Sequence, residues 1–418
     1  DQLSVGERLA GGRTRLLVAV ADVDVAAPKD SPIDQHAALN TTSVYTPARV
    51  FPMIPPRLST DLTSLNADVD RLAVVVAFTV GPDGAIEHDD VYGARVRNQA
   101  HLVYDDIDAF LAGRAALPPS GRAPGVREQL TLQDEAAQLL SKHRHELGAL
   151  DFDLTETRVR FEGDHLTGLT PELPNRAKSL IENLMIAANG AVARFLDSHN
   201  SPSIRRVVEQ PARWDRIVAI AATVGETLPP TPDALALSQF LARRKAADPD
   251  DFHELSHAVI RLIGAGQYLV DTPQTVAPGH FALAVKDYAH STAPNRRYSD
   301  LLTQRLLKAV LRGEPSPYTV DELVARARLC TQREDDANRV ERQVRKAAAA
   351  MLVANRIGQR FTAIVTGASP KGTYVRTLAP HIEGRLVKGG SGLDVGDRVA
   401  VRLSSVNVDR GFIDFAVA

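Results

Sequence analysis

The sequence lacks several features that would place the protein outside a reducing cytoplasm. It has a single cysteine, Cys330, so no disulfide can form within the chain. No segment approaches the roughly 20 apolar residues of a membrane-spanning helix, and the first residues do not resemble a secretory signal. We therefore expect a cytoplasmic protein that does not associate with membranes.

The sequence also lacks an excess of charge of either sign. The net charge of −2 argues against indiscriminate binding to polyanions, which normally requires an overall basic surface. Any nucleic-acid site must therefore be a local feature. At 418 residues and 44% hydrophobic content the chain is long enough for two or more packed domains. Because the first residue is Asp1 rather than methionine, we expect that residues upstream of it are missing.

Strand patterns come first along the chain and helical patterns follow. Residues 15–28 and 71–80 are rich in β-branched residues and predict buried strands, and Gly-Pro-Asp-Gly at 81–84 predicts a turn. Residues 125–146 and 177–196 predict helices, the second with Glu182 and Asn189 on one face. Asp22 and Asp24 share a face of the first strand, where they either cap or rim the strand end or, with partners from elsewhere, hold a metal ion.

The stretch 288–300, Tyr-Ala-His-Ser-Thr-Ala-Pro-Asn-Arg-Arg-Tyr-Ser-Asp, predicts a loop that leads into a helix at 301–311. Pro294 stiffens the turn, and Asn295 is a plausible helix cap. Arginine side chains beside a helix N-terminus suit phosphate binding. The alternative is an ordinary surface loop with an exposed pair of arginines.

One further motif matches a known pattern only weakly. The segment His253-Glu-Leu-Ser-His257 has the spacing of a zinc-protease helix, but the third ligands of the common zinc proteases are absent. We expect a surface helix with two exposed histidines. Residues 321–357 then predict a long, charge-rich helix.

The tail from about residue 358 has a different character. Short alternating strands are separated by turns at Pro370-Lys-Gly, at 388–392 and at 409–411, which is the spacing of a five-stranded barrel. Eight Lys and Arg residues against five Asp and Glu residues give the tail a net charge of +3. Phe361 and Tyr374 lie among these cations and suit stacking on single-stranded bases.

Six blocks of sequence carry a resemblance to a known family, and they occur in that family's order. They are Asp1–Val5, Val20–Val23, Asn40–Tyr45, Phe51–Pro55, Leu58–Leu65 and Tyr288–Asp300. Together they resemble the catalytic domain of the RNase II and RNase R exoribonucleases. The resemblance implies an α+β fold, with an RNB catalytic domain over residues 1–357 built on a mixed sheet surrounded by helices. The tail, residues 358–418, is similar to the family's OB-fold RNA-binding domain.

The function that this resemblance implies is processive 3′-to-5′ hydrolysis of single-stranded RNA to nucleoside 5′-monophosphates. The expected cofactor is Mg²⁺, the partner is single-stranded RNA, and the protein is expected to act as a monomer in RNA turnover. The alternative is a relative that has lost catalysis and binds RNA as a sequestering or regulatory module.

The resemblance also implies roles for individual residues. Asp1 matches the last member of the family's aspartate cluster and would be a catalytic residue and a Mg²⁺ ligand, and Arg296 matches the catalytic arginine. The residues implied in RNA binding are the aromatic clamp of Tyr45 and Phe152, the ribose-recognising pair of Tyr104 and Glu341, and Glu182 near the nucleotide path.

Two departures from the family pattern qualify these expectations. Where the family has a loop close to Thr-Ser-Pro-Ile-Arg, this chain has Thr292-Ala-Pro-Asn-Arg296, which keeps the proline and the arginine. The remaining aspartates of the cluster would precede Asp1. Since one carboxylate cannot hold a hydrolytic Mg²⁺ site, residues 1–418 are expected to be inactive alone.

Overall fold

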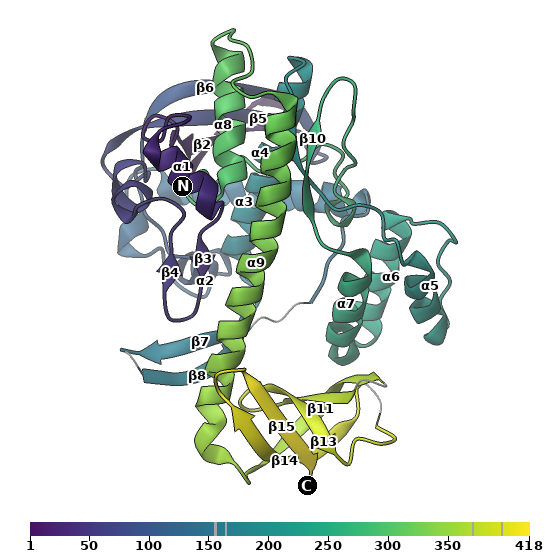
Figure 1. Cartoon of the computed structure of the whole chain (residues 1–418). Coiled ribbons are helices and arrows are strands. Elements are labelled where there is room, and N and C mark those ends of the chain that lie inside the picture. The colour runs from purple at the N-terminus through teal and green to yellow at the C-terminus, as the bar shows by residue number, and fades with distance from the viewer. Residues whose placement is uncertain (154–156, 164, 370–371, 394–395) are drawn as a thin grey trace.

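The computed structural model describes residues 1–153, 157–163, 165–369, 372–393 and 396–418. A body of sheets and helices is followed by a closed β-barrel, and helix α9 (Val320–Val353) runs from one to the other (Figure 1). The α+β class is confirmed. A search of the described helices finds none with the length and apolar character of a membrane span.

The principal sheet has the strand order β1 (Gln2–Arg8), β2 (Thr14–Ala21), β5 (Asp70–Val80) and β6 (Ile86–Arg97). Its three pairings are all antiparallel, so this sheet is antiparallel rather than mixed. For two of these pairings the reason is local, because β1 joins β2 and β5 joins β6 through short connections that only antiparallel neighbours allow.

Helices cover one face of this sheet. Alternate residues of the two central strands, such as Leu16, Val18, Val76 and Phe78, are buried in one core with side chains of α3, α4 and α8. The period of two along each strand places these side chains on the same face. The predicted helices are found as α3 (Val126–Glu146) and α4 (Arg176–Ser198), while α8 (Tyr298–Leu311) begins three residues earlier than expected.

The remaining elements of the body are shorter. Near the N-terminal half lie α1 (Pro32–Asn40), β3 (Val44–Tyr45), β4 (Val50–Phe51) and α2 (Tyr104–Leu111). Two ribbons consist of β7 (Thr157–Glu162) with β8 (His165–Pro171), and of β9 (Ser203–Val207) with β10 (Gln267–Asp271). Three helices, α5 (Trp214–Thr223), α6 (Ala234–Ala247) and α7 (Pro249–Ile263), enclose a separate apolar core around Trp214 and Phe240.

The strand predicted over residues 15–28 ends earlier, at Ala21. Asp22 still donates a backbone hydrogen bond to Leu72, and the chain then turns between Val23 and Ala27. The side chain of Gln304 accepts hydrogen bonds from the amides of Val23 and Asp24, so a helix side chain replaces the strand partner here.

The tail forms the predicted five-stranded barrel. Its strands are β11 (Arg360–Ser369), β12 (Gly372–Thr377), β13 (Glu383–Lys388), β14 (Arg398–Asn407) and β15 (Phe412–Val417), closed in the order β11-β12-β13-β15-β14. Two of the three predicted turns are found, one after β13 and one after β14. The remaining turn was predicted at Pro370 and Lys371, which lie outside the described residues.

Helix α7 does not expose both of its histidines, contrary to the expectation of a surface helix. His253 is buried, with Nε2 lying 2.5 Å from Nη1 of Arg376 on strand β12, and 3.1 Å from Nε2 of His257. Arg376 also donates to Glu254. The histidines were expected to face solvent because the sequence pattern of a helix does not show that a barrel lies against it.

Candidate active site and nucleic-acid interface

The geometry of the site starts with two residues from distant parts of the sequence. Nε of Arg296 donates to the Asp1 carboxylate across 3.2 Å, and both side chains are partly accessible. Within the described residues, the two Nη groups of Arg296 have no protein partner. The arginine can therefore be oriented by Asp1 and still offer donors to a ligand.

A buried asparagine holds the loop that carries Arg296. Asn189 on α4 accepts hydrogen bonds from both the amide and the hydroxyl of Ser291. Asp300, fully buried, accepts from the amide of Ala293 and from two nitrogens of Arg297. The loop is therefore fixed from both sides and is not the ordinary surface loop that was the alternative.

Asn295 is not the cap of helix α8, contrary to the sequence prediction. The capping position is Arg297, which makes no side-chain capping hydrogen bond. Asn295 is buried and its Oδ1 accepts from the hydroxyl of Thr63 at 2.6 Å. Thr63 lies far away in the sequence, so no local pattern could reveal this competing partner.

Tyr45 and Glu341 are brought together, although the resemblance had paired Glu341 with Tyr104. The amide of Tyr45 donates to Oε1 of Glu341 on α9 across 2.6 Å. The Tyr45 side chain remains 47% exposed. Ser43, two residues before Tyr45, donates its amide to the carbonyl of Arg296, so this segment is tied to the arginine loop as well as to α9.

The other predicted RNA-binding residues of the body lie in different surroundings. Tyr104 is half-exposed at the start of α2. Phe152 is partly buried against the core of helices α5 to α7, which is the environment of a core aromatic residue. Glu182 is exposed on α4 and lies close enough to Arg144 to raise that group's pKa, although burial of Arg144 lowers its pKa more.

A cluster of rings that no sequence motif predicted lies behind the arginine loop. The hydroxyl of Tyr268 lies 2.8 Å from Nδ1 of His290, and the Tyr288 ring meets both His290 and His280 edge to face. Burial, followed by nearby arginines including Arg297, lowers the pKa of His290 well below its usual value. Burial also lowers the pKa of His280, so the neutral form of both rings is favoured. The composition of segment 288–300 hinted at Tyr288 and His290 but not at Tyr268 or His280.

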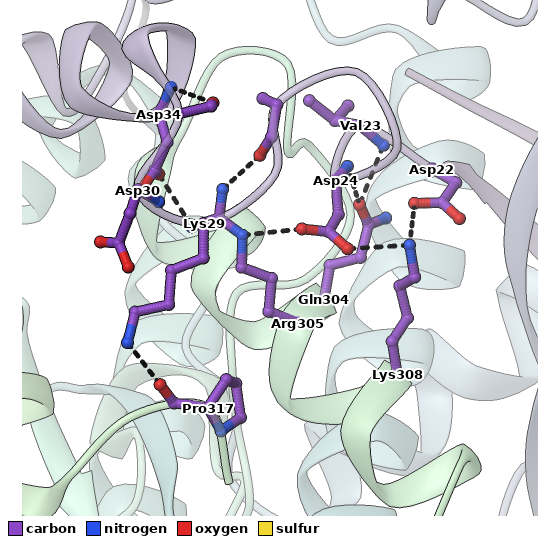
Figure 2. Close-up of polar contacts among 12 residues, drawn as sticks. Asp22, Val23, Asp24, Lys29, Asp30, Asp34, Gln304, Arg305, Lys308 and Pro317 are labelled. Carbon is purple, nitrogen blue, oxygen red and sulfur yellow. Dashed lines mark hydrogen bonds and ion pairs between the residues drawn. The ribbon is translucent and has the colours of Figure 1, made fainter. Parts of the chain in front are cut away.

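Asp22 and Asp24 act as counter-ions in the structure. Nζ of Lys308 lies 2.9 Å from a carboxylate oxygen of each aspartate, and Arg305 donates to Asp24 (Figure 2). Arg305 also donates to Asp34, which is buried with it. The hydrogen bonds from Lys308 and Arg305 outweigh the effect of burial and lower the pKa of Asp24.

In the barrel the two predicted stacking residues differ. Phe361 is buried, and its ring packs edge to face on Phe415 at a centroid distance of 6.1 Å. Tyr374 on β12 is 46% exposed. Of these two residues, only Tyr374 is accessible to a base without rearrangement of the barrel core.

The described residues do not by themselves fit a Mg²⁺ site. No group of three or more His, Cys, Asp or Glu side chains among them is arranged to hold a metal ion. Asp1 offers one carboxylate, already paired with Arg296, whereas Mg²⁺ requires near-octahedral oxygen coordination.

Two family models match the sequence and together cover most of it. The RNB domain matches residues 1–313, and the RNase II-type exonuclease C-terminal S1 domain matches residues 359–418. Ribonuclease R of Escherichia coli is 30% identical over 448 aligned positions, which cover 98% of this chain and 54% of that protein. The chain spans about half the length of the curated relatives it matches.

Solved structures agree on the fold. RNase R of Mycoplasma genitalium in complex with ribose-methylated single-stranded RNA matches all of this chain and 68% of that chain, with a TM-score of 0.89 at 23% identity. Yeast Ssd1, a pseudonuclease, matches 97% of this chain and 50% of that chain, with a TM-score of 0.73 at 18% identity. The shared fold thus occurs both in RNase R and in a pseudonuclease.

Proposed function

The chain belongs to the RNase II and RNase R family of RNB-domain exoribonucleases, and on this premise we propose that the protein removes nucleotides from the 3′ end of single-stranded RNA. The reaction is processive hydrolysis that releases nucleoside 5′-monophosphates and serves RNA turnover. We propose that the protein acts as a cytoplasmic monomer, with catalysis over residues 1–357 and an RNA-binding domain over residues 358–418.

The observation that carries the proposal is the pairing of Arg296 with Asp1 at the end of a rigid loop. Two Nη groups of Arg296 are left without protein partners in the described chain, and they would donate to the oxygens of the scissile phosphate. A donor group placed before the reaction at the position where charge develops, here the guanidinium as a whole, is worth about 10²- to 10³-fold in rate.

The RNA would be held by side chains around this arginine. Tyr45 and Phe152 are proposed to clamp the terminal bases, and Tyr104 and Glu341 to recognise the ribose end, with Glu182 along the path. Glu341 would act in addition by fixing the Tyr45 backbone. In the barrel both Tyr374 and Phe361 were candidates for base stacking, and we prefer Tyr374 because its side chain is exposed whereas Phe361 is buried.

Mg²⁺ is part of the proposal as the family's cofactor, with Asp1 as one ligand. The described residues do not complete its coordination, so no step of the reaction is assigned to the metal. What these residues do is orient an arginine and expose aromatic rings beside it.

The test uses the full-length protein and a 5′-labelled single-stranded oligoribonucleotide, with Mg²⁺ and with EDTA. We expect Mg²⁺-dependent shortening to a few nucleotides and no shortening of the same oligomer made as DNA. Arg296→Ala should slow the reaction by about 10²- to 10³-fold, as for the loss of one transition-state donor.

Arg312→Ala is the matched control, because Arg312 is an exposed arginine that follows the other end of helix α8 and pairs with Glu314. It should retain the wild-type rate. Binding of the RNA without shortening in any divalent metal would contradict the nuclease and support the alternative, an RNA-binding relative that acts by sequestration.

A further inference from the structure

The hairpin formed by β3 and β4 exposes more apolar surface than Tyr45 alone accounts for. Tyr45, Val50 and Phe51 are 47%, 49% and 50% exposed, and all three lie within seven positions. Tyr45 and Val50 account for one face of the hairpin, and Phe51 leaves a large apolar side chain exposed on the other face as well. In Figure 1 the hairpin projects from the body beside the middle of α9.

A cation lies over one of these rings. Cζ of Arg49 is 5.5 Å from the centroid of the Phe51 ring. In the described residues the guanidinium of Arg49 makes no ion pair, so its charge is available to a phosphate. An exposed aromatic ring beside an unpaired arginine is the combination with which proteins hold single-stranded nucleic acid, by base stacking and charge.

The turn of the hairpin is held in one conformation. The hydroxyl of Thr46 donates to the carbonyl of Arg49 and accepts from the amide of the same residue, and the Thr46 amide donates to that carbonyl as well. These three hydrogen bonds lie across the tip of the hairpin. The ring of Phe51 is therefore presented by a fixed backbone, which lowers the entropy cost of binding.

The base of the hairpin is tied to the arginine loop. Ser43 donates its amide to the carbonyl of Arg296 and accepts from the amide of Met53 through its hydroxyl. The hairpin therefore has a defined position relative to Arg296. A ligand held by Phe51 would lie at a fixed distance from the phosphate held by the arginine.

Phe51 and Tyr45 point to opposite sides of the hairpin. In the strand register Val44 faces Phe51 and Tyr45 faces Val50. Because directly opposed residues share a face and successive residues alternate, the rings of Tyr45 and Phe51 cannot stack on the same base.

We infer that Phe51 and Arg49 form a second base-stacking site for single-stranded RNA, at a nucleotide further from the 3′ end than the one at Tyr45. The inference rests on the proposed function, because it assumes that RNA reaches Arg296. Every base can stack on an aromatic ring, so the site increases the affinity for the RNA strand without sequence preference.

The experiment is an abasic scan. Full-length protein is titrated with fluorescent oligoribonucleotides in EDTA, each with one abasic position at a different distance from the 3′ end, and gels confirm that the RNA stays intact. For the wild type, affinity should fall roughly 5- to 150-fold at one position assigned to Phe51, the range expected for loss of one base stack. In Phe51→Ala that drop should vanish, and in Phe51→Trp it should return.

Matched variants separate this site from its surroundings. Tyr45→Ala should remove a drop at a different position nearer the 3′ end and leave the Phe51 position unchanged. Val276→Ala removes an apolar side chain that is 83% exposed elsewhere on the body, and it should leave the whole profile unchanged. Arg49→Ala should weaken binding of every oligomer and lower the salt dependence.

The outcomes distinguish this inference from the function on which it rests. If the wild type binds and shortens RNA but the profile of Phe51→Ala equals that of the wild type, the second site is refuted and the nuclease stands. If the wild type binds no RNA, both are refuted. If Phe51→Ala changes only self-association in sedimentation, the hairpin is a protein contact and the inference is wrong.

Discussion

At the scale of single residues, buried charge is stabilised by opposite charge. Arg305 is 3% exposed, yet it reaches the carboxylates of Asp24 and Asp34 (Figure 2). It also donates to the hydroxyl of Tyr318 and to the carbonyl of Ala27. A charge removed from water requires such partners. The aspartates that the sequence left open as metal ligands are therefore already committed to cations.

Replacing Arg305 with methionine tests the importance of this network. The change leaves the Asp34 carboxylate buried without its cation, so the free energy of unfolding should fall by about 3 to 5 kcal/mol, the usual cost of removing one partner of a buried pair. Urea unfolding curves measure the loss. Arg312→Met, at an exposed ion pair, is the control, and a loss no larger than that control's would show that Arg305 does not stabilise the fold.

His280 gives the protein a predictable sensitivity to acid. Burial, and then the charge of Arg206, lowers the pKa of His280 from 6.5 to about 4. The unfolded chain binds this proton at the higher pKa, so protonation favours unfolding. The contribution of neutral His280 to the free energy of unfolding is fully present above pH 6.5. It is lost as the pH falls from 6.5 to about 4. The loss from this one group is about 3 kcal/mol.

The variant that isolates this effect is His280→Asn. Nδ1 of His280 accepts a hydrogen bond from the amide of Leu283, and asparagine can accept the same bond without titrating. Between pH 6.5 and 4 the unfolding free energy of the variant should fall less steeply with falling pH than that of the wild type. The difference in slope should correspond to the uptake of about one proton on unfolding. Exposed His101→Asn should leave the slope unchanged, and equal slopes in wild type and His280→Asn would rule out the assignment.

At the scale of elements, periodicity predicted what depends on local sequence. The apolar spacing of α3 and α4 placed both helices to within two residues, and the turn spacing of the tail gave a five-stranded barrel. The predictions were wrong where a distant side chain competes with a local signal. Gln304 ends the first long strand at Ala21, and Thr63 takes Asn295 away from the helix it was expected to cap.

The same distinction applies to the candidate site. Segment 288–300 drew attention to Arg296 because its composition is unusual, and the resemblance supplied Asp1 as a partner. The contact of Tyr45 with Glu341 and that of Tyr268 with His290 join segments that the sequence does not connect. Such pairs have no periodicity or motif of their own, so only the folded chain shows them.

At the scale of the whole molecule, the barrel meets the body at more than one place. Helix α9 leads into it and contributes Ala350 and Val353 to its apolar core. On another side, Arg376 of β12 contacts His253 and Glu254 of α7. Burial, and then Arg376, lowers the pKa of His253, which favours a neutral ring beside the arginine. The α7 contact therefore limits how far the barrel can move about the end of α9.

Arg376→Met should loosen this contact without unfolding either part. The Arg376 and Glu254 side chains are only 22% and 11% exposed, so their pairing is partly shielded from water, and a hydrogen bond between charged groups of this kind contributes about 1.5 to 3 kcal/mol. Amides of α7 and β12 should therefore exchange hydrogen roughly tenfold faster or more, while those of β2 and β5 in the principal sheet stay protected.

Arg402→Met, at an exposed residue of β14, is the matched control and should leave hydrogen exchange in α7 unchanged. Faster exchange throughout the barrel would instead show that Arg376 stabilises the barrel itself, because a contact between two folded parts changes exchange only where they meet.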